Sequence, residues 1–192
     1  EYEVSNFFDQ IKKKTKKMDA LINNVGVAGP TGAIEKLNSE DWERTLKINV
    51  ISHFYFTKLA IPMLKKNKGG SIINISSGAG IMGFPLRSPY AASKWAVIGV
   101  TKTLAMELGK YNIRVNGINA DRIQSGILNN DLITKRAKAR NTTKEKYLKN
   151  NLLQQEVLAK DVADAFFAQI FLKKTTGNII TVDGGNIEAS LR

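Results

Sequence analysis

The sequence predicts an α/β domain built on a doubly wound parallel sheet that is flanked by helices. Short runs rich in β-branched residues alternate along the chain with longer segments of helical periodicity, and this rhythm is typical of parallel strands joined by crossover helices. The 192 residues are 43% apolar and 24% charged, enough for one globular domain that buries roughly 70% of its unfolded surface. In such a sheet, binding sites lie at the carboxyl ends of the strands.

The expected elements follow from apolar spacing, capping residues and glycine-rich breaks. Asn38 or Ser39 caps a helix with an acidic first turn, Pro62 is expected to kink that helix, and a Lys-Gly-Gly run ends it. In chain order we expect a helix near 4–17, a strand at 18–24, a glycine loop at 26–32, a helix from about 38 to 67, a strand at 71–76, a helix from about 90 to 110, a strand at 114–119, a helix from 159 to about 172 and a strand at 178–182.

The counts of cysteine and histidine exclude several kinds of chemistry. With 0 Cys and 1 His, the chain builds no disulfide framework, thiolate nucleophile or zinc finger, and we expect no metal site. His53 lies in an apolar helical run, where a Ser-His-Asp triad would need its base held in a packing face. We therefore expect His53 to be a packing residue.

The net charge of +12 raises the question of a nucleic-acid partner. Half of this excess is local, because residues 132–149 carry seven basic side chains and one acid. No basic stripe is interleaved with stacking aromatics, and no zinc-knuckle or RNA-recognition signature is present. We therefore expect no nucleic-acid partner.

Neither a membrane span nor a signal peptide is expected. No apolar run approaches the 18 or so residues that cross a bilayer, and the first residues lack the charge and apolar core of a signal peptide. A cytoplasmic protein is the expectation. The chain starts without Met inside a helical pattern, which suggests a fragment or a partial chain.

The glycine-rich segment 78–83 matches a dinucleotide fingerprint but stands in the wrong context. Its G-x-G-x-x-G pattern follows a strand, as a phosphate-binding turn should. That turn should open directly into a helix, whereas residues 84–89 contain two prolines. The phosphate-binding interpretation is the less favoured one.

A stronger signal comes from Tyr90 and Lys94, which share one helix face at the i and i+4 positions. An ammonium about 4 Å from a phenol stabilises the phenolate by roughly 4 kcal/mol at an effective dielectric near 20. Such a tyrosine can exchange a proton at cellular pH. Taken alone, a surface Tyr–Lys pair remains the more favoured interpretation.

Further motifs surround this pair, and together they resemble the short-chain dehydrogenase/reductase family. The resemblance covers essentially the whole chain and rests on Asn-Asn-Val-Gly at 23–26, Lys-Ile-Asn-Val at 47–50, a serine at 77, Tyr-x-x-x-Lys at 90–94, Ile-Arg-Val-Asn at 113–116 and the Thr-Gly to Asp-Gly-Gly stretch at 176–185. It implies a Rossmann-like fold and an oxidoreductase that transfers hydride between NAD or NADP and an alcohol or carbonyl substrate.

The resemblance also implies the catalytic roles. Tyr90 is expected to be the general acid and base toward the substrate oxygen, and Ser77 is expected to donate a hydrogen bond to that oxygen. Lys94 is expected to assist Tyr90 and to hold the nicotinamide ribose. Asn49 is expected to hold a water that links Lys94 to solvent, with a buried helix amide as the alternative.

Cofactor contacts are expected from a wider set of residues. Besides Tyr90 and Lys94, the resemblance implies backbone contacts at Asn23 and Gly26, a carboxamide contact at Ile123, and a phosphate contact at Ser125.

Two departures from the family pattern are visible. The Pro-Gly pair that usually follows the strand ending near residue 119 is replaced by Ala120-Asp121. The family's Thr-Gly-x-x-x-Gly-x-Gly turn and its first three strands are absent. We therefore expect residues 1–192 to form the C-terminal three quarters of one such domain, with a substrate-covering lid at about 121–158.

Other functions stay open beside the dehydrogenase. An epimerase or dehydratase can use the same Ser, Tyr and Lys, and a truncated or inactive homologue could act by association. A homotetramer or homodimer is implied through the helices at 41–66 and 90–110. The basic segment favours an anionic substrate held by Arg136 and Arg140 at i and i+4, with a solvated helix face as the alternative.

Overall fold

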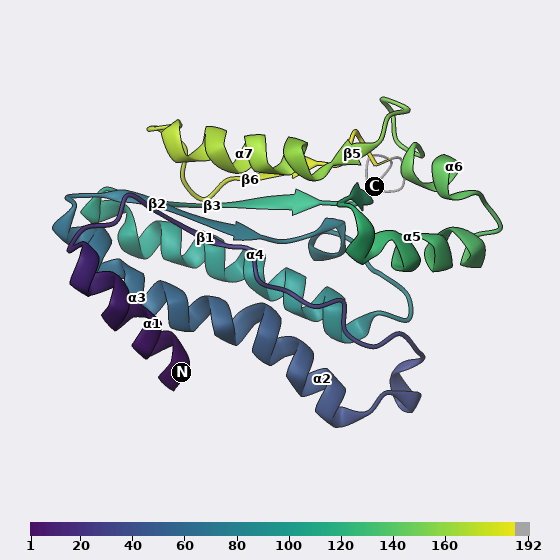
Figure 1. Ribbon diagram of the computed structural model, residues 1–192, viewed down its shortest axis with the longest axis horizontal. Coiled ribbons are helices and arrows are strands. Elements are labelled where there is room, and N and C mark those ends of the chain that lie inside the picture. The colour runs from purple at the N-terminus through teal and green to yellow at the C-terminus, as the bar shows by residue number, and fades with distance from the viewer. Residues whose placement is uncertain (187–192) are drawn as a thin grey trace.

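The computed structural model describes residues 1–186, without the side chains of residues 127–129. Its main sheet has the order β1-β2-β3-β6, and every neighbouring pair of strands is parallel (Figure 1). The strands are β1 (Ala20–Asn23), β2 (Gly70–Ile75), β3 (Ile113–Ala120) and β6 (Ile179–Val182). The predicted α/β class with a parallel sheet is confirmed.

Helices cover both faces of this sheet, because β2 and β3 are apolar on each face. Figure 1 shows α1 (Tyr2–Lys14), α3 (Ser52–Lys66) and α4 (Ser88–Leu108) on one side of the sheet and α7 (Ala159–Phe171) on the other. Ile72 of β2 packs in the core beneath α1, α3 and α4, whereas its neighbour Ile73 packs beneath α7. This alternation is what two-sided burial requires of a strand.

The helical segment after residue 38 is interrupted at a different place from the one expected. The Asn38 side chain caps α2 (Ser39–Leu46) by accepting from the Glu40 amide at 2.7 Å. A π-helical turn at Lys47–Ile51 separates α2 from α3, and α3 continues through Pro62. The interruption of this helical segment therefore lies at the π turn, where the hydrogen bonding changes, and not at Pro62, where the sequence predicted a kink.

The long helix α4 begins two residues before Tyr90. Pro89 lies in its first turn, where a missing backbone N–H is tolerated. A 3-10 turn at Gly109–Tyr111 ends the helix, and Asn112, with a φ of 58°, leads into β3. Tyr90 and Lys94 are thus both in the first two turns of α4, at the end of the helix near the carboxyl ends of the strands (Figure 1).

The segment after β3 contains a second, two-stranded sheet that the sequence did not predict. The strands β4 (Ile123–Gln124) and β5 (Val157–Leu158) pair in parallel, and between them lie α5 (Ile127–Ala139) and α6 (Lys144–Leu148). Tyr147 and Leu148 of α6 pack against Ile133 and Ala137 of α5 in a small core of their own. This pairing joins the two ends of the expected lid.

Within residues 1–186, none of the helices has the length and the apolar composition needed to cross a bilayer.

Candidate active site

Ser77 and Tyr90 line the same small cavity at the carboxyl ends of β2 and β3. The cavity has a volume of about 190 Å³, and Ile123 and Ser125 lie in its wall as well. Ser77 comes two residues after β2, and its hydroxyl accepts a hydrogen bond from the Ala79 amide at 3.3 Å. The structure therefore brings together four of the residues that the sequence selected.

The glycine pattern at 78–83 lies beside this cavity without opening into a helix. Gly78–Gly80 forms a single 3-10 turn, and α4 starts only at Ser88. The expected break between this pattern and the next helix is therefore present, and the geometry of a helix-borne phosphate turn is absent here.

Lys94 is almost completely buried and lies close to Tyr90. Its ammonium is 5.7 Å from the centroid of the Tyr90 ring and donates to the Ile75 backbone oxygen at 3.1 Å. Burial lowers the pKa of Lys94 from its ordinary value of 10.5 to about 8. The ammonium can therefore exchange a proton at mildly alkaline pH.

Asn49 occupies the middle of the π-helical turn and is fully buried. Its amide nitrogen donates to the Val27 backbone oxygen at 3.0 Å and to the Ser93 hydroxyl at 2.9 Å. A Cβ placed on Gly26 would lie 3.4 Å from the Asn49 amide oxygen and 3.6 Å from the Lys94 ammonium. Gly26, Asn49 and Lys94 therefore converge on one point beside the loop that follows β1.

Asn23 has a different environment from the other candidates, because its side chain points into the interior. Its amide donates to the Thr57 hydroxyl at 3.1 Å and to the Asn74 side chain at 2.8 Å, and Asn74 donates to Thr101 at 2.9 Å. This buried chain of polar groups was not found from the sequence. A contact of Asn23 with a cofactor would therefore have to come from its backbone.

Asp121, which replaces the usual glycine, places a carboxyl group in the cavity wall. The carboxyl accepts from the Asn186 amide at 2.6 Å, and the Arg122 Nε lies 3.6 Å away. Burial raises the pKa of Asp121, and the Arg122 charge opposes that shift.

The basic helix α5 contributes one arginine to the cavity. Arg136 lines it, whereas the guanidinium of Arg140 lies 5.4 Å from the Tyr147 ring centroid and does not line it. The prediction that Arg136 and Arg140 hold one anion together is therefore wrong for Arg140. Arg87, which the sequence analysis missed, lies 5.0 Å from the Tyr90 ring and donates to the Ala28 backbone oxygen at 2.6 Å.

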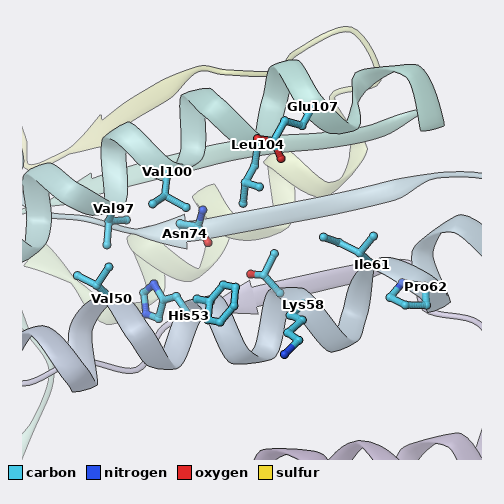
Figure 2. Close-up of a pocket in the computed structure, with 12 residues that line it drawn as sticks. Val50, His53, Lys58, Ile61, Pro62, Asn74, Val97, Val100, Leu104 and Glu107 are labelled. Atoms are coloured by element: carbon cyan, nitrogen blue, oxygen red, sulfur yellow. The ribbon is translucent and has the colours of Figure 1, made fainter. Parts of the chain in front are cut away.

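His53 lines a second, apolar cavity of about 380 Å³ between α3 and α4 (Figure 2). Its Nε2 lies 2.9 Å from the Val25 backbone oxygen, so Nε2 carries the proton, and Nδ1 is buried with no hydrogen-bond partner among the described residues. Burial lowers the pKa of His53. Figure 2 shows Val97, Val100 and Leu104 of α4 facing His53 and Ile61 across this space. His53 is a packing residue of this groove, as expected.

The groups beside Tyr90 fit the ribose at the nicotinamide end of a dinucleotide. A ribose hydroxyl both donates and accepts hydrogen bonds, and the Lys94 ammonium offers a strong donor. Gly26 carries no side chain beside that ammonium, which leaves its approach open. Gly26, Tyr90 and Lys94 therefore fit such a group.

Comparisons with known proteins identify the same family as the sequence motifs do. The family model described as short chain dehydrogenase matches residues 1–136. Over 108 residues the chain is 46% identical to trans-4-hydroxycyclohexanecarboxylate dehydrogenase of Sinomonas cyclohexanicum, covering 56% of this chain and 41% of that protein. It is 32% identical over 184 residues to 3-oxoacyl-[acyl-carrier-protein] reductase of Thermotoga maritima, covering 95% of this chain and 72% of the relative.

A solved structure extends the likeness to the fold. The crystal structure of NAD⁺-bound xylitol dehydrogenase superposes with a TM-score of 0.87 at 26% identity, covering 95% of this chain and 74% of that chain. The likeness in fold therefore extends over nearly the whole chain.

Proposed function

This chain belongs to the short-chain dehydrogenase family, and from that premise we propose that its active site interconverts a small alcohol and the corresponding carbonyl compound. The oxidoreductase function by hydride transfer and the nicotinamide dinucleotide cofactor that the sequence predicted are confirmed by the comparisons. The observation that supports the alcohol and carbonyl chemistry is the joint position of Ser77 and Tyr90 in one cavity.

Two hydroxyl groups of this chain act on the substrate oxygen. In the reducing direction, the Tyr90 hydroxyl gives its proton to the carbonyl oxygen as the carbonyl carbon receives hydride, and in the oxidising direction the phenolate takes that proton back. The Ser77 hydroxyl donates a hydrogen bond to the same oxygen and stabilises the negative charge that develops on it. When bound, the nicotinamide dinucleotide supplies the hydride or accepts it.

Lys94 and Asn49 support the proton transfer from behind Tyr90. A lysine with a pKa of about 8 can take up and release a proton under the conditions in which Tyr90 must be recharged. Asn49 and Gly26 border the ammonium, which supports a water-linked route from Lys94 to solvent. In this proposal Gly26, Tyr90, Lys94, Ile123 and Ser125, together with the backbone of Asn23, hold the cofactor.

Replacement of the phenol tests this mechanism. We expect Tyr90→Phe in the intact protein to lower kcat by about 10²–10⁴-fold and to keep most of the NADH affinity, because the hydroxyl that transfers the proton is lost while the Lys94 ammonium still binds the cofactor. Lys94→Ala should lose both turnover and affinity, and Tyr111→Phe, at the far end of α4, is the matched control. Turnover of Tyr90→Phe at the level of the unaltered protein would overturn the mechanism and favour a homologue that acts by association.

The proposal includes an assembly and a location. The apolar groove between α3 and α4 leaves Phe54 and Val100 exposed, and a second copy of the chain would cover them in a homodimer or homotetramer. We further propose that the chain forms one domain with residues 121–158 as its lid. We also propose that the protein is located in the cytoplasm.

A further inference from the structure

The cavity that contains Ser77 and Tyr90 has its far wall on the basic segment. Helix α5 contributes Ile133 and Arg136 to this wall, and α6 contributes Tyr147. Ser77, Tyr90 and Arg136 therefore border one space of about 190 Å³. A molecule whose oxygen contacts the hydroxyl pair is within reach of α5.

Arg136 differs from the other arginines around this space because no described group lies within hydrogen-bond or ion-pair distance of it, although its charge acts on Arg87 and on the Asp121 carboxyl group. Among the residues that the structure describes, no hydrogen bond and no ion pair within 4.0 Å involves its guanidinium. Arg122, by contrast, donates to the Asn150 backbone oxygen at 2.6 Å and stacks 5.1 Å from the Tyr147 ring. Arg87 donates to the Ala28 backbone oxygen at 2.6 Å. Arg136 is the guanidinium that remains available to a ligand.

The charges around the cavity leave a positive excess. Arg122 lies against the Asp121 carboxylate, which also accepts from Asn186. Arg87 and Arg136 are close enough for each to feel the charge of the other. A half-buried guanidinium that faces another cation gains most from a carboxylate, because the planar fork of arginine matches the two carboxylate oxygens.

The size and the remaining wall restrict the rest of the ligand. A space of about 190 Å³ is smaller than the roughly 300–1,000 Å³ that a drug-sized ligand occupies. Phe84, Leu132 and Ile133 add apolar surface to the wall. A short aliphatic stem suits this surface better than a sugar or a large ring.

We propose that Arg136 selects the substrate of the proposed dehydrogenase, and that this substrate is a small hydroxy or oxo acid whose carboxylate pairs with the Arg136 guanidinium. The inference rests on the proposed function. It assigns Arg136 as the specificity residue and leaves Arg140 outside the site. The reacting carbon then lies near Ser77 and Tyr90, and the carboxylate lies near Arg136.

Matched acids and esters test the assignment. The intact protein and its Arg136→Met, Arg136→Lys and Arg140→Met variants are assayed with pyruvate, acetoacetate and levulinate, and with the methyl ester of each acid. In the unaltered protein, we expect kcat/KM for the best acid to exceed that for its ester by on the order of a hundredfold. A ratio of about tenfold is the smallest that supports the inference. Arg136→Met should bring the ratio near one, Arg136→Lys should restore part of it, and Arg140→Met should leave it unchanged.

Binding measurements separate this inference from the proposed function. Calorimetric titration of the NAD⁺ complex with butyrate, an acid without a reacting oxygen, should show binding that Arg136→Met removes and Arg140→Met keeps. The NADH dissociation constant should be the same in all variants. Esters and acids turned over equally, or NADH affinity that falls with Arg136→Met, would overturn the inference while the dehydrogenase stands. Arg136-dependent butyrate binding without any turnover would uphold the inference and count against the dehydrogenase.

Discussion

Asn49 holds both backbone groups of Val27: its Oδ1 accepts from the Val27 amide at 2.7 Å, and its Nδ2 donates to the Val27 carbonyl at 3.0 Å. The Asn49 side chain thus pairs the backbone N–H and C=O of Val27, as a neighbouring strand would, at the point where the chain leaves β1. The π-helical turn at Lys47–Ile51 carries this side chain, so an irregularity in one helix fixes the loop that passes the active site.

We expect Asn49→Ala to lower the free energy of unfolding by about 2 kcal/mol, because it leaves the Val27 amide and carbonyl without partners in a half-buried place. Chemical denaturation of the intact protein measures this change. Asn67→Ala, which removes an exposed hydrogen bond to Asp19 and a long one of 3.3 Å to the Gly69 backbone oxygen, should cost less, about 0.5 kcal/mol. Equal losses for the two variants would contradict the role given to Asn49.

Gly26→Ala tests the space between Asn49 and Lys94. The new methyl group would make contacts of 3.4 Å and 3.6 Å with these two side chains, so we expect little change in melting temperature. The same methyl group excludes water from the Lys94 ammonium. It should therefore shift the alkaline limb of the curve of activity against pH. Gly83→Ala, where nothing lies within 4 Å, is the control that should shift neither quantity. Identical profiles for Gly26→Ala and Gly83→Ala would count against a water-linked route at this place.

The lowered pKa of Lys94 makes stability depend on pH in a definite direction. Between pH 8 and 10.5 the folded protein has released the Lys94 proton while the unfolded chain still binds it, so stability rises with pH in this window. The full rise is about 3 kcal/mol. Lys94→Met should lack this rise and should be more stable than the unaltered protein at pH 7. Parallel curves of unfolding free energy against pH for the two proteins would show that Lys94 keeps its ordinary pKa.

The groove between α3 and α4 gives a prediction about assembly. Phe54 is 54% exposed and Val100 is 39% exposed, and both line the apolar cavity of Figure 2. If a second copy covers them, Phe54→Asp with Val100→Asp buries charge at the contact and should lower the mass measured by light scattering to that of a smaller assembly. Ile34→Asp, an equally polar change in the exposed 3-10 turn before α2, should leave the mass unchanged. A mass that the double variant does not alter would place the contact elsewhere.

Local sequence patterns predicted most of the sheet, and they selected Ser77 and Tyr90 of the first cavity. Strands of four or more residues can be recognised in the sequence because β-branched runs such as 71–76 are continuous. Ser77 and Tyr90 can be recognised because they belong to motifs of fixed spacing. The two-residue strands β4 and β5 have no such pattern, since their pairing joins Ile123 to Val157 across a long stretch of chain.

The arrangement of charges around the cavity was less predictable for the same reason. Arg87 precedes α4 and Arg136 lies within α5, and only the folded chain brings their charges near each other. Helical spacing alone grouped Arg136 with Arg140, but the Arg140 guanidinium lies 5.4 Å from the Tyr147 ring centroid, and Arg140 does not line the cavity. Contacts between elements, rather than periodicity within one element, decide which cation reaches a ligand.

The parallel pairing of β4 with β5 means that the chain leaves the main fold and returns to it at neighbouring points. Residues 125–156, which include Arg136, form a cassette between these two points, whereas Ser77, Tyr90 and Lys94 lie outside it. Recombination at β4 and β5 would exchange the wall that recognises the substrate as one block and keep the proton-transfer residues in place. Selectivity and reactivity can therefore diverge independently along this chain, and a chimaera with cassette ends at 125 and 156 is the natural unit for redesign.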